Sequence, residues 1–147
     1  MEIAILALGC FWGPEIKFSE INGIKKTEVG YCGGNSPNTS YKEVCLGSTN
    51  HAEVVRLEFD PNIISYENII ETFFKFHDPT TLNSQGPDFG TQYRSEIFYE
   101  NENQKKIAKK VLDSINEKLS GKVVTKISPV NNYCKAEEYH QKYLKKN

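Results

Sequence analysis

The spacing of apolar residues along the chain predicts an alternating series of strands and helices. Residues 2–8 are apolar at both odd and even positions, which is typical of a central strand buried on both faces. Segments in which apolar and polar residues alternate predict the other strands, at about residues 27–31, 52–59, 95–100 and 123–127.

Apolar residues at helical spacing predict three main helices. The first covers about residues 14–21, because proline suits the first helical position and the acidic Glu15 suits the first turn. Ser65 is a suitable N-cap for the second helix. The third begins near Glu102 and ends near Gly121.

Two segments without periodicity, 32–50 and 78–93, are rich in glycine and turn-forming residues and are predicted to be long loops. An irregular tail, with a short helix near 136–144, follows Pro129. The order β-α-β-β-α-β-α-β contains a βαββαβ unit. We therefore expect an α+β fold, a ferredoxin-like two-layer sandwich, in a single domain that spans residues 1–147.

Composition limits the classes of function. The 147 residues carry 18 Lys and Arg against 19 Asp and Glu, so no overall charge favours nucleic acid or an anionic membrane. The longest apolar run, residues 3–8, is too short to cross a bilayer, and no basic residue precedes it as in a signal peptide. We expect a cytoplasmic protein with no nucleic-acid or membrane partner, and we expect it to act as a monomer.

Four cysteines raise the question of metal or redox chemistry. They are Cys10, Cys32, Cys45 and Cys134, with no C-x-x-C pair, and the three histidines stand apart. We therefore expect no metal site. A chain of this length needs no disulfide framework, so each thiol is either an inert small hydrophobe or a reactive group.

Cys10 has the most informative position of the four. It follows a buried strand and precedes a helix start, where free backbone N–H groups favour a negative charge. We expect this to lower the pKa of the thiol and make Cys10 the most reactive cysteine. Gly9 and Gly13 leave room for a sharp turn beside the sulfur. The alternative is an inert cysteine buried at a strand end.

Three further residues, Phe11, Trp12 and Glu53, have side chains that suit a reactive Cys10. Two large rings beside a nucleophile can line a pocket for a small apolar group, or they can simply pack the first helix on the sheet. Glu53 has the same parity as Val55, so its carboxyl is predicted to point to the apolar face, where desolvation raises its pKa. Such a carboxyl is a candidate general acid. The alternative is that it frays into water or pairs with a Lys or Arg.

The two predicted loops hold further polar candidates. Tyr41 and Tyr93 could each donate a phenolic hydrogen bond, and Asp88 could bind a ligand amide. For each of them, an ordinary core, surface or turn-capping role is the alternative. His140 is interpreted as a polar contact that docks the tail, not as a base.

These motifs together resemble the A-type peptide methionine sulfoxide reductases, over about residues 3–144. The matching segments, in order, are Gly9-Cys-Phe-Trp-Gly-Pro-Glu15, Gly30-Tyr-Cys-Gly-Gly34, Tyr41-Lys-Glu-Val-Cys45, His51-Ala-Glu-Val-Val55, His77-Asp-Pro-Thr-Thr81, Gln85-Gly-Pro-Asp-Phe-Gly-Thr-Gln-Tyr-Arg-Ser95 and Ala136-Glu-Glu-Tyr-His-Gln141.

The resemblance implies a role for each candidate. Cys10 is the nucleophile, and Glu53 is the acid that protonates the sulfoxide oxygen. Phe11 and Trp12 are implied to form a cage for the substrate methyl group. Tyr41 and Tyr93 are implied to hold the sulfoxide oxygen with their hydroxyls, and Asp88 to bind the main chain of the substrate. It also implies methionine S-sulfoxide as substrate, free or in proteins, and a role in repairing oxidative damage.

The implied chemistry needs no metal, flavin or nucleotide. Attack on the sulfoxide sulfur leaves a sulfenic acid on Cys10; a second thiol then forms a disulfide, and thioredoxin is implied as its reductant. Many family members carry the resolving cysteines on a C-terminal extension, and this chain stops at Asn147. We rank Cys134 first as the resolving thiol and Cys32 second, with Cys45 last. Direct reduction by an external thiol is the alternative.

Two other functions remain open from the residues alone. One is a Cys–His acyl-transfer hydrolase that uses Cys10 with His51 or His140, which would show a burst with an ester substrate. The other is a non-catalytic peptide-binding module on the same sheet, in which Cys10→Ser would leave affinity intact.

Overall fold

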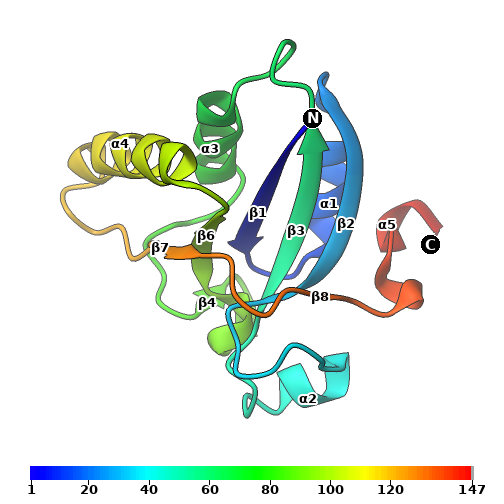
Figure 1. Cartoon of the computed structure of the whole chain (residues 1–147). Helices are drawn as coiled ribbons and strands as arrows, with labels where there is room; N and C mark the ends of the chain where they lie inside the picture. The colour runs from blue at the N-terminus through cyan, green and yellow to red at the C-terminus, as the bar shows by residue number, and fades with distance from the viewer. Residues whose placement is uncertain (147) are drawn as a thin grey trace.

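A six-stranded mixed sheet forms the centre of the structure, a computed structural model that describes residues 1–146 (Figure 1). Its strand order is β7-β6-β1-β3-β2-β8, and all neighbours are antiparallel except β6 and β7. The strands are β1 (Glu2–Leu8), β2 (Ile24–Cys32), β3 (Ala52–Phe59), β6 (Ser95–Tyr99), β7 (Lys126–Pro129) and β8 (Cys134–Lys135).

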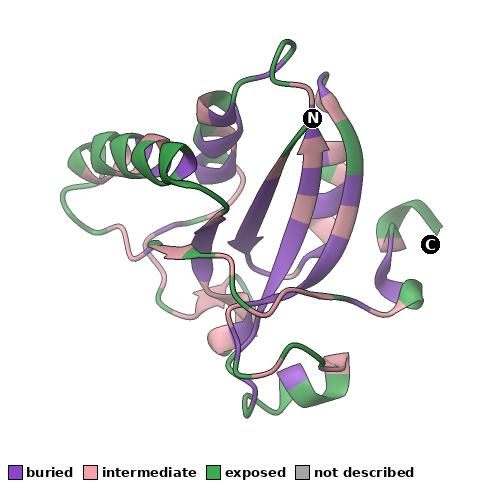
Figure 2. Cartoon of the chain, in the orientation of Figure 1, coloured by how far each residue is buried: buried purple, intermediate pink, exposed green. Residues whose placement is uncertain are grey.

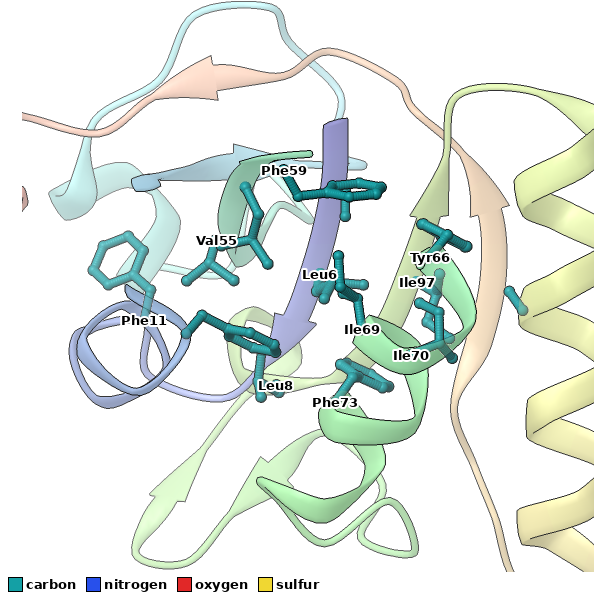
Figure 3. Packing of buried hydrophobic residues seen from close by; sticks show 14 of the residues in the cluster. Leu6, Leu8, Phe11, Val55, Phe59, Tyr66, Ile69, Ile70, Phe73 and Ile97 are labelled. Atoms are coloured by element: carbon teal, nitrogen blue, oxygen red, sulfur yellow. The ribbon is translucent and has the colours of Figure 1, made fainter. Parts of the chain in front are cut away.

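One face of the sheet packs against the long helices. The helices are α1 (Trp12–Ser19), α3 (Tyr66–Lys75) and α4 (Glu102–Lys118), and α4 lies beside α3 at the β6–β7 edge. Figure 3 shows side chains of α3 such as Phe73 packed against Leu6 and Ile97 of the sheet, while Phe11 closes the far end of the same core. The fold is therefore α+β, as predicted.

Strand β1 is buried on both faces (Figure 2), which confirms the prediction from its apolar run. Leu6 and Leu8 belong to the helix-side core, whereas Ile5 and Ala7 pack with Phe98 on the opposite face. On that opposite face, Val130 and Tyr133 from the C-terminal tail provide part of the cover. Both faces of β1 are thus covered, and α3, α4 and the C-terminal tail, which supply much of this cover, are far from β1 in sequence.

Both predicted loops contain short regular elements that the sequence pattern did not reveal. The first loop holds α2 (Tyr41–Cys45), which begins at the N-cap Ser40. The second holds the hairpin β4 (Ser84–Gln85) and β5 (Asp88–Phe89), followed by the 3₁₀ helix η1 (Thr91–Tyr93). Elements of two to five residues are too short to show a period, so periodicity cannot predict them.

The C-terminal region also differs from the expected pattern. The last predicted strand starts three residues late, at Lys126, because the Val124 N–H donates to the Pro79 carbonyl at 2.8 Å instead of joining the sheet. Strand β8 was not predicted. The tail continues through the 3₁₀ helix η2 (Glu138–His140) to α5 (Tyr143–Lys146). In the described part of the chain, no helix has the length and apolar character needed to cross a membrane.

The N-cap of α3 yields a prediction about stability. The Ser65 hydroxyl accepts a hydrogen bond from the Asn68 N–H at 3.1 Å, as expected from the sequence. Ser65→Ala should therefore lower the free energy of unfolding by about 1 kcal/mol, whereas Ser65→Asp should retain it. Chemical denaturation measures both. Equal stability of Ser65→Ala and the parent would contradict the role of the cap.

Candidate active site

Cys10 lies in the turn between β1 and α1, beside the loop 78–93. Gly9 reaches a φ of +98° in this turn, and a Cβ on it would lie 2.9 Å from the side chain of Gln85. A larger residue is therefore disfavoured both by backbone strain and by this contact. The turn places the Cys10 thiol, which is half-buried, at the end of the sheet with the helix start behind it.

The pKa of the Cys10 thiol is raised and not lowered, so the prediction of an acidic thiol was wrong. Burial raises its pKa to about 11, and the negative charges of Glu53 and Asp88 act in the same direction. A hydrogen bond from the Trp12 N–H lowers the pKa, but by less than burial raises it. The helix start does stabilise the thiolate, as argued from sequence; desolvation outweighs it. Exposed Cys45, not Cys10, should react first with alkylating agents.

Glu53 points into the same core, as its parity predicted. Its side chain is buried with only 1% of the residue exposed. One carboxyl oxygen accepts a hydrogen bond from the Phe11 N–H at 3.2 Å, and the other accepts one from Gln92 Nε2 at 3.2 Å. These partners replace the Lys or Arg pairing that was the alternative. Desolvation raises the pKa of Glu53 to about 7, although both hydrogen bonds oppose it.

A ring cluster stands next to Cys10. Phe11 is buried, and the centroid of its ring lies 5.8 Å from that of Tyr31 and 5.2 Å from that of His140. Trp12 donates from Nε1 to His140 Nδ1 at 3.1 Å and stacks on Tyr143, with the ring centroids 3.8 Å apart. The two predicted cage residues therefore belong to one aromatic assembly that the C-terminal segment completes.

The three loop candidates also gather at this end of the sheet. Tyr41 begins α2 and its ring lies 4.5 Å from that of His140. Burial raises the pKa of Tyr41 above its ordinary value and that of Tyr93 to about 12; a hydrogen bond from Tyr41 partly offsets the rise at Tyr93. The charge of Asp88 contributes to the raised pKa values of Cys10 and Glu53. All three side chains thus act on the same site.

Two residues of the site, Gln92 and Tyr143, escaped the sequence reasoning, and His140 has a larger role than the docking contact predicted for it. Gln92 bridges the site, because its Nε2 contacts both Glu53 and the Cys45 sulfur, the latter at 3.4 Å. His140, interpreted as a docking contact, does hold the tail, but it does so on the rings of Phe11 and Trp12. Tyr143 completes the stack. The only signal in the sequence was the presence of Gln92 and His140 in the matching motifs.

The other cysteines differ in their access to the site. Cys134 pairs with Tyr31 across the sheet, and Tyr31 pairs with Glu53, so the three side chains share one face. Cys32 is completely buried on the opposite face, with Ala52 and Val54. The structure therefore brings Cys134 toward the site but does not bring Cys32 to it.

The histidines of the rival hydrolase have other partners. His51 uses both ring nitrogens inside the loop 33–51: Nδ1 accepts from the Gly34 N–H at 3.1 Å, and Nε2 lies 2.7 Å from the Ser36 carbonyl. His140 accepts from Trp12. Within residues 1–146, no three His, Cys, Asp or Glu side chains are grouped as a metal site requires.

The buried carboxyl of Glu53 generates a prediction about stability and pH. Its pKa rises from about 4.5 in an unfolded chain to about 7 here, so the folded state loses stability as the pH rises through this interval. Glu53→Gln has no such group. Relative to the parent, it should gain about 3 kcal/mol of unfolding free energy between about pH 4 and pH 8. Glu117→Gln, an exposed position on α4, is the control. A pH-independent difference between Glu53→Gln and the parent would contradict the burial of a protonated carboxyl.

Comparison with known proteins agrees with this geometry. The family model described as peptide methionine sulfoxide reductase matches residues 2–147. The chain is 70% identical over 146 residues to the peptide methionine sulfoxide reductase MsrA of Pelagibacter ubique (strain HTCC1062), and the match covers 99% of both chains.

Solved structures show the same fold. Reduced Mxr1 from Saccharomyces cerevisiae aligns with a TM-score of 0.94 and 43% identity, over 99% of this chain and 85% of that one. Mxr1 in complex with Trx2 aligns with a TM-score of 0.69 and 26% identity, over 97% and 84%. The chain belongs to the peptide methionine sulfoxide reductase family, and its reaction is the reduction of methionine sulfoxide to methionine.

Proposed function

We propose that Cys10 is the nucleophile of this reaction and that Glu53 is its general acid. The observation that carries the proposal is the position of the Glu53 carboxyl. It is buried, bound to the N–H of Phe11 next to Cys10, and has a pKa of about 7. A carboxyl with this pKa both holds and releases a proton near neutrality, as a general acid must.

In the proposed step, the methionine sulfoxide oxygen accepts a hydrogen bond from the protonated Glu53 carboxyl while the Cys10 sulfur attacks the sulfoxide sulfur. A bond forms between the two sulfurs. This bond and the sulfur–oxygen bond of the substrate both break as the oxygen passes to Cys10, which becomes a sulfenic acid, and methionine leaves. Glu53 gives its proton to the oxygen and takes up the proton that the Cys10 thiol loses, so the carboxyl is regenerated and the sulfenic acid carries one proton. The step therefore balances without a metal or cofactor, and Cys10 is oxidised while the substrate is reduced.

The neighbouring side chains have supporting roles in this proposal. Phe11 and Trp12 bind the substrate methyl group, because their rings stand beside Cys10 in one aromatic assembly. The hydroxyls of Tyr41 and Tyr93 hold the sulfoxide oxygen as hydrogen-bond donors, because a phenol is protonated at neutral pH and burial raises both pKa values further. Asp88 binds a main-chain N–H of the substrate. The favoured substrate is the S epimer of methionine sulfoxide, free or in a protein.

For recycling, we propose that Cys134 attacks the sulfenic acid. The products are a Cys10–Cys134 disulfide and water. The shared face of Glu53, Tyr31 and Cys134 supports this choice, and the burial of Cys32 on the other face argues against that residue. A thioredoxin then reduces the disulfide by thiol exchange; the complex of Mxr1 with Trx2 supports such a reductant.

The remaining proposals concern the whole protein. The order β6-β1-β3-β2, antiparallel throughout, supports a ferredoxin-like core, and the one six-stranded sheet at the centre of the structure supports one domain over residues 1–147. The four free thiols are consistent with a reducing compartment such as the cytoplasm, where the enzyme would repair oxidised methionine. The monomeric state stays a prediction.

The role of Glu53 is tested by Glu53→Gln. The amide keeps the size of the side chain but has no acidic proton, so turnover at neutral pH should fall by roughly 10²-fold or more. Glu58→Gln is the matched control, because Glu58 lies on the same strand and forms ion pairs away from the site. Rates are measured with a methyl sulfoxide substrate and dithiothreitol. Unchanged turnover in Glu53→Gln would exclude the acid role.

The resolving thiol is tested by Cys134→Ser. This variant should complete one stoichiometric reduction of the sulfoxide and then stop, since thioredoxin has no disulfide to reduce. Cys32→Ala should turn over normally, because its sulfur lies on the far side of the sheet. Mass analysis after one equivalent of substrate identifies the trapped species. Full thioredoxin-driven turnover by Cys134→Ser would show that another thiol resolves the sulfenic acid.

A further inference from the structure

Glu15 is a buried carboxylate that the proposed chemistry does not use. From the sequence, its expected role was to compensate the dipole in the first turn of α1. In the structure only 2% of the residue is exposed, although it lies just three residues after Trp12. A buried carboxylate is costly unless hydrogen bonds satisfy it, so its partners indicate what it does.

The carboxylate of Glu15 fastens the C-terminal segment to α1. One oxygen accepts a hydrogen bond from the Lys142 backbone N–H at 2.7 Å, and the other accepts one from the Thr27 hydroxyl at 2.9 Å. The ammonium group of Lys142 lies 3.8 Å from this second oxygen. Lys142 has a φ of +52°, a conformation unfavourable for a residue with a side chain. The Glu15 carboxylate thus holds the chain at a strained turn.

The residues on either side of this turn contact Trp12. His140 accepts the hydrogen bond from the indole N–H of Trp12, and Tyr143 stacks on the indole ring with an interplanar angle of 9°. The turn at Lys142 sets the direction in which the chain leaves His140 and brings Tyr143 back over the indole. Glu15 and Trp12, on the same helix, therefore hold the same segment at neighbouring points.

A separate contact fixes the upstream half of this segment. The Gln141 side-chain amide bonds both the N–H and the carbonyl of Val29, each at 2.9 Å, as an added strand would. It also donates to the Ala136 carbonyl at 3.0 Å. These bonds hold residues 136–141 without Glu15, and the Lys142 ammonium group donates to the Thr27 carbonyl at 3.2 Å. Loss of the carboxylate should therefore release mainly the Lys142 backbone and Tyr143.

We propose that Glu15 is a positioning residue for the methyl cage: by binding the Lys142 N–H it keeps Tyr143 stacked on Trp12 and so holds the indole beside Cys10. This inference rests on the proposed role of Trp12 in binding the substrate methyl group. Glu15 touches no reacting atom and acts only through the C-terminal segment. Misplacement of a substrate-binding group by about 1 Å is enough to slow an enzyme strongly.

The test uses Trp12 itself as the probe, since it is the only tryptophan in the chain. In Glu15→Ala, tryptophan emission should shift to the red and acrylamide should quench it more readily, because Tyr143 no longer covers the ring. The kcat/KM for a methyl sulfoxide with dithiothreitol should fall by roughly tenfold, mainly through a higher KM. Glu20→Gln, an exposed position at the end of the same helix, should change neither.

Two further variants separate positioning from a merely structural role. Glu15→Gln retains one acceptor for the Lys142 N–H and should restore most of the Trp12 signal and of the KM. Tyr143→Ala, close to the end of the chain, should reproduce both effects of Glu15→Ala. The double variant should be no worse than either single variant, because both changes remove the same stacking contact. If Glu15→Ala fails to fold, Tyr143→Ala takes its place, because the red shift of Trp12 emission and the higher KM should both appear in that variant.

Two results would overturn the proposal. One is unchanged Trp12 fluorescence and KM in a folded Glu15→Ala variant. The other is an additive effect of the Glu15 and Tyr143 changes, which would mean that Glu15 acts by another route. Failure of the proposed function would look different. Cys10→Ser would keep its activity, or the KM would stay unchanged in a variant whose Trp12 fluorescence has changed.

Discussion

The contact between the Glu53 carboxyl and the Phe11 N–H is the constraint on which the site depends. It joins the start of β3 to the turn after β1, 42 residues away, and so places an acid beside the thiol. The same contact lies in a water-poor region, which raises the pKa of Glu53 to about 7. The position of the Glu53 carboxyl and its protonation state therefore have one cause, which is its burial at the end of the sheet.

Burial has the opposite chemical effect on the nucleophile. The pKa of about 11 means that Cys10 is a neutral thiol before substrate binds. When Glu53 is protonated, the thiol and the carboxyl each hold one proton: in the proposed step the carboxyl gives its proton to the oxygen, and the thiol proton restores the carboxyl.

The C-terminal segment completes the site from a distance of more than 100 residues. His140 and Trp12 are separated by 128 positions, and Glu15 and Lys142 by 127. The Glu137 carboxylate adds a third link, because it accepts hydrogen bonds from the Tyr31 hydroxyl and from the Tyr41 N–H, both at 2.9 Å. The tail predicted to be irregular is therefore as much a part of the site as the strand and turn that carry the nucleophile.

The amino-acid sequence by itself determined the main strands and helices, the α+β class and the inward direction of Glu53, because a period of two or 3.6 residues is a local property. Its motifs were also sufficient to indicate the family. Only the tertiary structure decided the pKa of Cys10, the bridging role of Gln92 and the difference in access between Cys134 and Cys32. Desolvation and contacts between distant segments arise only when the chain has packed, so no local pattern records them.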